Sequence, residues 1–395
     1  MSGDFSRRTV LGIGTGAALA AGAMVRAAPL QQPVKKRSDS LGIALVGIGL
    51  LTEGQLLPGL TRTKGVHLAA LVSGHPEKAQ RYADQYGLPH RQIYNYDNYD
   101  RLADDPSVQI VYIVLPNFMH AEYTIRALKA GKHVLCEKPM AVTVHECEQM
   151  IAAAKTAKRH LMIAYRCQYE PLNLTAMRLM REQALGRPRI VHTDMGRQTS
   201  LQIPSDAWRL DMAKSGGGAL ADMGIYGINA ARYLLNEEPV EVRAWARTDH
   251  DDPRFKTVED LINWQMRFPS GAIGEGSTSF SQPGTMAYQV VGETTRLVAD
   301  PGCFYNGNKL SLIGGNLTTP HITEIDQFAR EMDWMGDVVR GTAPMVSPGE
   351  EGMQDMRLMH AMLESVAKDG ATIATDWGYR RAVDPAAVVD VPAIT

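Results

Sequence analysis

The chain of 395 residues has few cysteines, no surplus of one charge and no long apolar run, and each lack excludes a class of protein. Cys136, Cys147, Cys167 and Cys303 have neither the paired spacing of a zinc site nor the density of a disulfide framework, so we expect buried free thiols. A net charge of −2 provides no basic surface for nucleic acid. The sequence therefore predicts no metal site and no nucleic-acid partner, and it favours a small-molecule ligand.

The N-terminus differs in character from the rest of the chain. Arg7 and Arg8 precede an uncharged stretch rich in Gly and Ala that is too short and too glycine-rich to span a membrane. Paired arginines before such a stretch are typical of a twin-arginine export signal, with cleavage after Ala27 or after Ala23. We therefore predict a signal at 1–27 and a mature protein in the periplasm, exported folded and outside the membrane. A basic tail on a cytoplasmic protein is the alternative.

A polar linker at 28–40 leads into a first domain, 41–165, in which strands and helices alternate. Strands are predicted at 41–46, 66–72, 109–115 and 133–136, and helices at 76–86, 120–130 and 143–157. This alternation predicts an α/β Rossmann domain, a doubly wound parallel sheet that binds its ligand outside the carboxyl ends of the strands.

The pattern changes in residues 166–395, where strands follow one another with few helices between them. Strands are predicted at 190–198, 240–247, 261–268, 272–280, 287–291 and 294–299, and helices at 223–235, 325–340 and 353–367. We expect an α+β domain with a large, mainly antiparallel open sheet that binds substrate and supports dimerisation.

The first predicted strand runs directly into Gly47-Ile48-Gly49, followed by Thr52 where a dinucleotide fingerprint often has a third Gly or Ala. Gly47 permits a tight turn, and Gly49 lets the backbone approach a pyrophosphate. The second strand ends at Ser73 without the acidic residue that holds the ribose of NAD, and Lys78 follows. A hydroxyl and a lysine suit a 2′-phosphate, so NADP is favoured over NAD.

Two further motifs carry reactive groups. Glu137-Lys138 ends a parallel strand, where a lysine would face the nicotinamide end of a cofactor. Asp222 and Tyr226 follow the triple glycine 216–218 and lie four residues apart, on one face of a predicted helix. Taken singly, Asp222 could be a helix N-terminal charge, Tyr226 a core aromatic and Lys138 a surface residue.

Together these motifs resemble the Gfo/Idh/MocA oxidoreductase family. The resemblance rests on Gly47-x-Gly49, Glu137-Lys138-Pro139 and Asp222-x-x-x-Tyr226, and it covers nearly the whole chain from about Leu41. Further runs that resemble the family are 71–74, 111–117, 120–122, 164–167, 208–210, 225–227, 347–355 and 375–379.

The resemblance implies a set of site residues. Lys138 and Tyr226 would be the catalytic pair, with Asp222 orienting the sugar or the lysine. Beside Gly47 and Gly49, the residues implied to bind NADP are Ser73, Lys78, Tyr96, Leu115, Pro116, Asn117, His120, Glu137, Lys138, Arg166, Trp208, Arg209 and Tyr305. A nearby ammonium favours a phenolate, so we expect Lys138 to lower the pKa of Tyr226.

The tyrosine at 226 is similar to the family's glucose–fructose subgroup, whereas many members have histidine there. This likeness implies oxidation of an aldose at C1 to the lactone and reduction of a second sugar to its alditol, by a ping-pong mechanism on a tightly bound NADP. An aldose 1-dehydrogenase with dissociable NADP, a nicotinamide-dependent glycosidase and a silent sugar sensor are the alternatives.

The resemblance also bears on assembly. It implies a homodimer through the exposed face of the second sheet, and a tetramer is possible. Only about a dozen residues, with Pro29 and Pro33, separate the signal from Leu41, where the subgroup has a long proline-rich arm. The short arm leaves both cofactor retention and tetramer assembly open.

Overall fold

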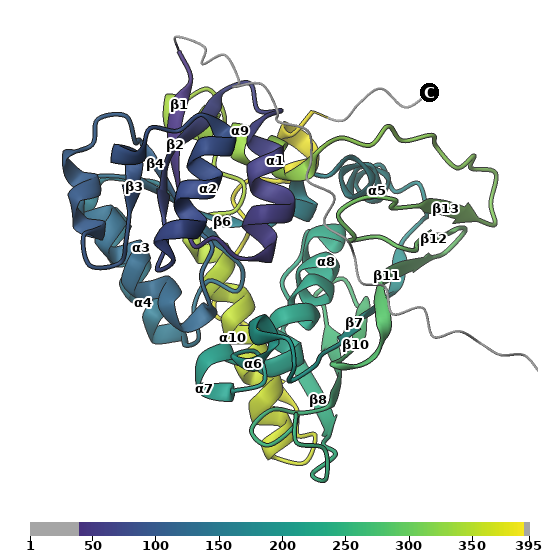
Figure 1. Cartoon of the computed structure of the whole chain (residues 1–395). Helices are drawn as coiled ribbons and strands as arrows, with labels where there is room; N and C mark the ends of the chain where they lie inside the picture. The colour runs from purple at the N-terminus through teal and green to yellow at the C-terminus, as the bar shows by residue number, and fades with distance from the viewer. Residues whose placement is uncertain (1–38, 391–395) are drawn as a thin grey trace, which may run out of the picture.

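A computed structural model of the chain describes residues 39–390 (Figure 1). The predicted export signal and nearly all of the predicted linker lie outside the described residues. Within 39–390, no helix is both long enough and apolar enough to cross a membrane. All four cysteines are buried free thiols.

The N-terminal part forms a six-stranded parallel sheet with the strand order β3-β2-β1-β4-β5-β6. Its strands are β1 (Leu41–Val46), β2 (Val66–Val72), β3 (Ile93–Tyr94), β4 (Ile110–Ile113), β5 (His133–Glu137) and β6 (Leu161–Ala164). Strand order reverses between β1 and β4, so right-handed crossovers place α1 (Leu57–Leu60) and α2 (Pro76–Tyr86) on one face and α3 (His120–Lys129) and α4 (Val144–Ala157) on the other. The predicted Rossmann sheet is confirmed, and its ligand-binding edge lies after β1, β2, β4 and β5.

Local sequence explains the ends of the helices. Pro76 opens α2 with a preset φ, and Gly87 closes it in the left-handed conformation. Before α4, the Thr143 hydroxyl accepts a hydrogen bond from the Glu146 backbone N–H at 3.2 Å, while the Glu146 carboxylate accepts one from the Thr143 N–H at 3.0 Å. This capping box fixes the start of α4.

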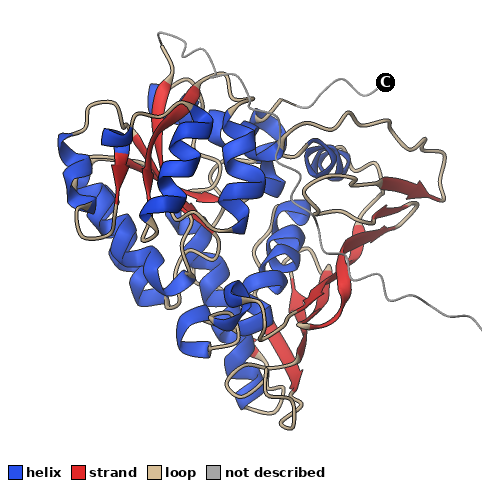
Figure 2. Cartoon of the chain, viewed as in Figure 1, coloured by secondary structure: helices blue, strands red, loops and turns tan. Residues whose placement is uncertain are grey.

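The C-terminal part forms an eight-stranded sheet with the order β13-β12-β11-β7-β10-β9-β8-β14. Its strands are β7 (Pro188–Gln198), β8 (Glu241–Arg247), β9 (Leu261–Arg267), β10 (Ile273–Ser279), β11 (Ser281–Gly292), β12 (Arg296–Ala299), β13 (Leu310–Ile313) and β14 (Ile373–Ala374). Every pair is antiparallel except β7 with β10. Figure 2 shows helices on one side of this sheet and none on the other, so the expected open, mainly antiparallel sheet is confirmed.

The helices of the second half do not all stay with the second sheet. They are α5 (Pro171–Arg181), α8 (Ile225–Leu235), α9 (Gln327–Arg340) and α10 (Gly349–Ala367), with single turns α6 (Pro204–Ala207), α7 (Met212–Ser215) and α11 (Pro385–Val388). Helix α9 packs on α1 and β2, and α10 packs on α4 and β6 as well as on β8. The segment before α10 bonds to the edge of β6, where the Ile163 N–H donates to the Ser347 carbonyl at 2.8 Å. Helices from the C-terminal half thus pack around the N-terminal sheet and complete the first lobe, which is built on that sheet; the second lobe is built on the eight-stranded sheet.

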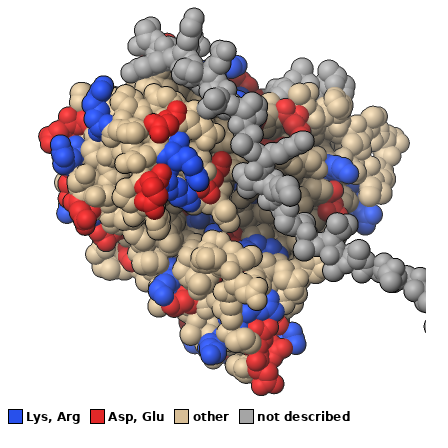
Figure 3. All heavy atoms as spheres, in the orientation of Figure 1, with Lys and Arg blue, Asp and Glu red and all other residues tan. Residues whose placement is uncertain are grey.

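Several short elements escape sequence prediction. Strands β3 and β14 have two residues each, and β6 and β13 have four. Such short segments give too few residues for a periodic pattern. Helix α5 was also not predicted. On the face shown in Figure 3, acidic and basic side chains are interspersed, in keeping with the near-neutral net charge.

Candidate active site

A cavity of about 340 Å³ lies at the carboxyl ends of the parallel strands, where the two lobes meet. The walls include residues from both lobes, which brings together positions far apart in the sequence. The sequence-predicted site residues that line this cofactor cavity are Gly47, Gly49, Ser73, Tyr96, Leu115, Pro116, Asn117, Glu137, Lys138, Arg166, Trp208, Arg209, Asp222, Tyr226 and Tyr305. Lys78 and His120 do not line it.

The two glycines of the first turn have different structural roles. Gly47 has a φ of +98°, and a Cβ there would lie 2.3 Å from the Val114 carbonyl oxygen. A Cβ at Gly49 would meet no other described atom within 4 Å, so the backbone borders open space. Thr52, in the third position of the fingerprint, donates its hydroxyl proton to the Gly47 carbonyl at 2.7 Å and closes the turn. Gly47 therefore serves the fold, and Gly49 leaves room for a ligand.

The end of β2 offers polar groups without a carboxylate. Ser73 is buried, and its hydroxyl accepts a hydrogen bond from the His75 N–H at 3.1 Å. Tyr96 packs against this turn, since a Cβ on Gly74 would lie 3.1 Å from its ring. The ammonium of Lys78 instead pairs with Glu53 at 2.9 Å, outside the cavity wall. Lys78 would have to leave Glu53 to reach a phosphate.

His120 has a place in the fold and does not face the cavity. Its ring is fully buried, with Nδ1 bonded to the Pro139 carbonyl at 2.9 Å and Nε2 to the Leu115 carbonyl at 2.8 Å. It thereby ties together the loops that follow β4 and β5, and both of these loops carry cavity residues. The interpretation of His120 as a cofactor ligand does not fit this position, because both of its ring nitrogens are engaged.

Lys138 and Asp222 meet across the boundary between the lobes. The Lys138 ammonium donates to the Asp222 backbone carbonyl at 2.7 Å and lies 3.8 Å from its carboxylate. Burial lowers the pKa of Lys138, although Asp222 and Glu137 act against that shift. Burial would raise the pKa of Asp222, but the cations Arg209, Lys138 and Arg197 hold it well below its usual range. Asp222 is therefore an anion that fixes the position of the lysine.

Tyr226 lies between two cations. The Lys138 Nζ is 4.5 Å from the centre of its ring, and the Arg166 guanidinium is 4.8 Å from the same point. Burial raises the pKa of Tyr226, and the cation that most strongly opposes this rise is Arg166. Burial therefore favours the neutral phenol of Tyr226, and the expected lowering of its pKa is wrong in its net direction.

Arg166 organises the wall around Tyr226. Its guanidinium also stacks 4.8 Å from the ring of Tyr305, and it donates to the Cys303 carbonyl at 2.6 Å and to Gln327 Oε1 at 2.7 Å. Gln327 in turn donates to the Tyr305 carbonyl at 2.7 Å. These bonds hold the segment that carries Tyr305 against the cavity.

A second cavity of about 520 Å³ adjoins the first and shares Lys138, Arg166, Arg209, Asp222 and Tyr226 with it. Arg209 and Arg197 reach the Asp222 carboxylate at 3.2 Å and 3.1 Å. The catalytic candidates Lys138 and Tyr226 thus lie where the two cavities meet.

Helix α8 holds Tyr226 in place through a buried charge cluster. Arg232, two turns further along the helix, is fully buried and pairs with Glu238 at 2.7 Å, Glu351 at 3.1 Å and Asp355. Glu351 and Asp355 belong to α10, so the cluster ties the catalytic helix to the helix that completes the first lobe. The chain before α8 begins with a five-residue π-helical turn at Leu220–Gly224, which brings Asp222 toward Lys138.

Three residues around the site were not predicted from the sequence. Phe328 lines the cofactor cavity, Gln327 binds Arg166, and Arg197 binds Asp222. In the sequence, the first two open an amphipathic helix, and Arg197 ends a strand. Only the tertiary fold could reveal their role, since Gln327 lies 161 residues from Arg166.

Comparison with known proteins identifies the fold. An oxidoreductase family model with an NAD-binding Rossmann fold matches residues 41–165, and the GFO/IDH/MocA C-terminal domain model matches residues 173–298. The chain belongs to the Gfo/Idh/MocA oxidoreductase family. The predicted resemblance is confirmed in both halves of the chain.

Members of the family with known names are similar over most of the length. The crystal structure of aldose–aldose oxidoreductase from Caulobacter crescentus, complexed with glycerol, is 40% identical with a TM-score of 0.81 and covers 85% of this chain and 99% of that one. D-xylose 1-dehydrogenase [NADP(+)] from Haloarcula marismortui is 30% identical, over 82% of this chain and 90% of its own. 1,5-anhydro-D-fructose reductase from Ensifer adhaerens is 30% identical, over 70% and 76%.

The residues present fit the nicotinamide dinucleotide that the family implies. The open space beside Gly49 admits a pyrophosphate close to the backbone, at the start of the helical turns that follow β1. The buried hydroxyl of Ser73 would hold the adenosine ribose, and Lys138 and Tyr226, which line the same cavity, would lie at the nicotinamide end.

Proposed function

We propose that the protein is an NADP-dependent sugar oxidoreductase that oxidises an aldose at C1 to the lactone and reduces a second sugar, fructose or another aldose, to the alditol. The observation that carries this proposal is the contact between Lys138 and Tyr226 at the junction of the glycine-lined cleft and the second cavity. The names of the similar proteins support a sugar as the substrate class.

The cofactor would be held along the first cavity. Gly47 and Gly49 would border its pyrophosphate, Ser73 its adenosine ribose, and Glu137 and Arg166 its nicotinamide end. When bound, NADP supplies the redox chemistry, taking up or giving back a hydride at the sugar carbon. NADP is preferred over NAD because no carboxylate stands at the end of β2.

Lys138 and Tyr226 are the groups that would exchange a proton with the sugar oxygen. Because Tyr226 is a neutral phenol, it suits protonation of the carbonyl oxygen when a sugar is reduced. In the oxidative direction the C1 hydroxyl must lose a proton, and the neutral amine of Lys138, the form that burial favours, would take it up. Asp222 keeps the lysine in position in both directions.

A single spectroscopic experiment tests the coupled reaction. The purified protein is followed at 260–360 nm before and after glucose is added without external nicotinamide. A band that grows near 340 nm and is bleached by a second sugar would support bound NADP and a ping-pong cycle. If no band forms with any aldose even when NADP is supplied, the proposed function is wrong.

A plain aldose 1-dehydrogenase with dissociable NADP is the second candidate. The similarity to the relative named D-xylose 1-dehydrogenase [NADP(+)] favours it. In that case the band near 340 nm would form only when NADP is supplied in solution, and NADPH would separate from the protein on a desalting column.

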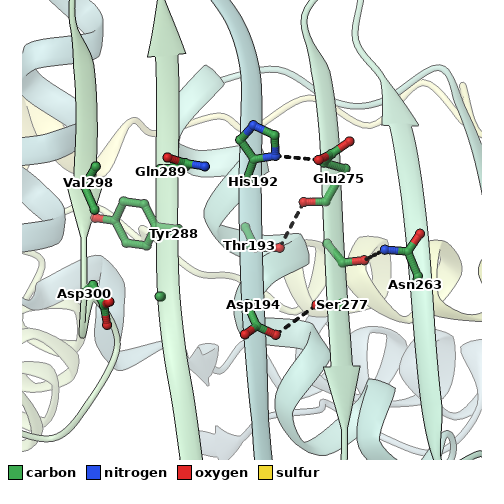
Figure 4. Close-up of a pocket in the computed structure, with 12 residues that line it drawn as sticks. His192, Thr193, Asp194, Asn263, Glu275, Ser277, Tyr288, Gln289, Val298 and Asp300 are labelled. Atoms are coloured by element: carbon green, nitrogen blue, oxygen red, sulfur yellow. Dashed lines mark hydrogen bonds and ion pairs between the residues drawn. The ribbon is translucent and has the colours of Figure 1, made fainter. Parts of the chain in front are cut away.

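We also propose a homodimer that forms through the open face of the second sheet. This face carries a hollow of about 370 Å³ between β7, β10 and β11, where His192 pairs with Glu275 at 2.5 Å and Ser277 bonds to Asp194 at 2.9 Å (Figure 4). Trp245 of β8 and Ile273 of β10 are both more than 40% exposed on the same face. Sedimentation of the wild type and Ile273→Glu tests this proposal, since a dimer through this face should dissociate in the variant.

Export by the twin-arginine route to the periplasm completes the proposal and rests on Arg7 and Arg8. Replacement of both by lysine should retain the protein in the cytoplasm, as cell fractionation would detect.

A further inference from the structure

Two buried glutamates share one tyrosine hydroxyl behind the cofactor cavity. Tyr112 of β4 donates to Glu137 Oε1 at 2.8 Å and lies 3.4 Å from Glu331 Oε2. Tyr112 and Glu331 are fully buried, and Glu137 is 8% exposed. The three residues come from β4, β5 and α9, so the fold brings them together from distant parts of the chain.

The group holds one negative charge. A phenol has a single proton to donate, so it can satisfy only one carboxylate, and two adjacent buried carboxylates do not both ionise. Glu331 is the neutral member. Burial, and after it the nearby charge of Glu137, raises the pKa of Glu331 well above the usual range. The Oε1 atom of Glu331 has no hydrogen-bond partner among the described residues. Burial also raises the pKa of Glu137, but Lys138 acts against this shift, and the Lys138 N–H donates to Glu137 Oε2 at 3.3 Å.

Only the charged member faces the cofactor cavity. Glu137 lines it together with Lys138 and Arg166, whereas Tyr112 and Glu331 lie behind the wall. Glu331 is on the same helix as Gln327, one turn later, so α9 supports both Arg166 and Glu137. The arrangement runs from a protonated acid, through a phenol, to a carboxylate at the cavity.

We propose that Tyr112 and protonated Glu331 hold Glu137 as a single carboxylate at the cavity wall, where its charge favours the oxidised, cationic nicotinamide over the reduced, neutral one. Glu137 is then a residue that sets the redox preference of the site, and Glu331 and Tyr112 are positioning residues. This inference rests on the proposed nicotinamide-dependent function. It assigns the three residues no proton transfer with the sugar.

The test compares two isosteric variants. Glu137→Gln removes the charge, and Glu331→Gln preserves the neutral state of its side chain. Dissociation constants for NADP⁺ and NADPH, and for NAD⁺ and NADH, are measured by calorimetry. The ratio of the oxidised to the reduced constant should rise by about tenfold or more in Glu137→Gln and stay within about twofold in Glu331→Gln.

If the cofactor copurifies, the same ratio is read from the midpoint potential of the bound nicotinamide, followed at 340 nm against a mediator couple. A tenfold change is about 30 mV for a two-electron couple. Tyr112→Phe provides a second variant. It removes the hydrogen bond that favours the charged form of Glu137, so it should shift the ratio in the same direction as Glu137→Gln.

The outcomes separate this inference from the proposed function. An unchanged ratio in a folded Glu137→Gln protein that still binds dinucleotide would overturn the inference alone. Equal shifts in both glutamine variants would overturn the assignment of the charge to Glu137. Failure of the wild type to bind any dinucleotide would overturn the proposed function and this inference together.

Discussion

The two ends of the cofactor cavity are built in different ways. At the glycine end, local backbone shapes the cavity: Gly47 takes a φ of +98°, Thr52 closes the turn, and Ser73 directly follows the neighbouring strand β2. At the catalytic end, side chains from distant segments meet, with Lys138 after β5, Arg166 after β6 and Tyr226 in α8. The glycine end is therefore defined by the shape of the backbone, and the catalytic end by the charges of its side chains.

The difference matters for what substitutions do. A change at the glycine end alters backbone geometry and so affects folding or ligand access, whereas a change at the catalytic end alters proton chemistry in a site already held by Arg232 and Gln327. Substitutions at the two ends should therefore separate binding from turnover.

The largest effect is expected at Tyr226. Tyr226→Phe removes the proton donor and leaves the ring between Lys138 and Arg166, so turnover should fall by about 10²–10⁴-fold while dinucleotide binding is retained. Steady-state kinetics and calorimetry measure the two quantities. Tyr86→Phe, on α2 and away from the cavity, is the matched control. Turnover within about threefold of the wild type in Tyr226→Phe would remove this hydroxyl from the mechanism.

Two alanine substitutions test the glycine end. Gly47→Ala forces a Cβ against the Val114 carbonyl at positive φ and should lower the free energy of unfolding by about 3 kcal/mol. Gly49→Ala meets no clash and should leave stability within about 0.5–1 kcal/mol of the wild type, yet weaken dinucleotide binding by about tenfold, because its Cβ occupies the open space. Denaturant titration and calorimetry measure these changes. If both variants lose only stability, the space beside Gly49 has no role in binding.

Sequence reasoning was most successful where function lies in contiguous motifs. The strand–glycine turn, Glu137-Lys138 and the Asp222–Tyr226 spacing each combine a local structural signal with reactive groups, and all of them reach the same cavity. The doubly wound parallel sheet followed from the alternation of elements, and the open second sheet followed from closely spaced strands without helices between them.

The positions of the other site residues depend on tertiary packing, which the local sequence does not show. The family resemblance implied His120 as a cofactor ligand, but the carbonyls of Pro139 and Leu115 engage both of its ring nitrogens. Lys78 was predicted to bind a phosphate because it follows a strand end without an acidic residue; its ion pair with Glu53, 25 residues earlier, could not be predicted from the local sequence. Gln327 and Glu331 carry no local motif, since their role depends on the return of α9 to the first lobe.

Glu259 tests the link between charge and folding at the catalytic end. It lies beside Gly218, a glycine that precedes the catalytic helix α8 in the sequence. Burial raises the pKa of Glu259 to about 7, although hydrogen bonds from the backbone of Glu259 and Leu220 act against the rise. The folded protein keeps this proton up to about pH 7, whereas the unfolded chain releases it near pH 4.5, so stability falls as pH rises between these values.

Glu259→Gln lacks this titration and should therefore be more stable relative to the wild type at pH 8 than at pH 5, by up to about 3 kcal/mol. Urea unfolding at the two pH values measures the difference, with the exposed Glu77→Gln as control. A relative stability that does not depend on pH would show that Glu259 is ionised in the folded protein throughout this range.

The smallest effect is expected at the ribose end, where Ser73→Asp places a carboxylate in the position that NAD enzymes use. Repulsion of a 2′-phosphate should weaken NADP binding by about tenfold and leave NAD binding unchanged or stronger, so the ratio of the two dissociation constants reports the change. Lys78→Gln should weaken NADP binding less than Ser73→Asp does, because Lys78 pairs with Glu53 at 2.9 Å outside the cavity wall. A larger loss in Lys78→Gln would mean that the lysine leaves Glu53 for the phosphate, and that side-chain charge governs the glycine end as well.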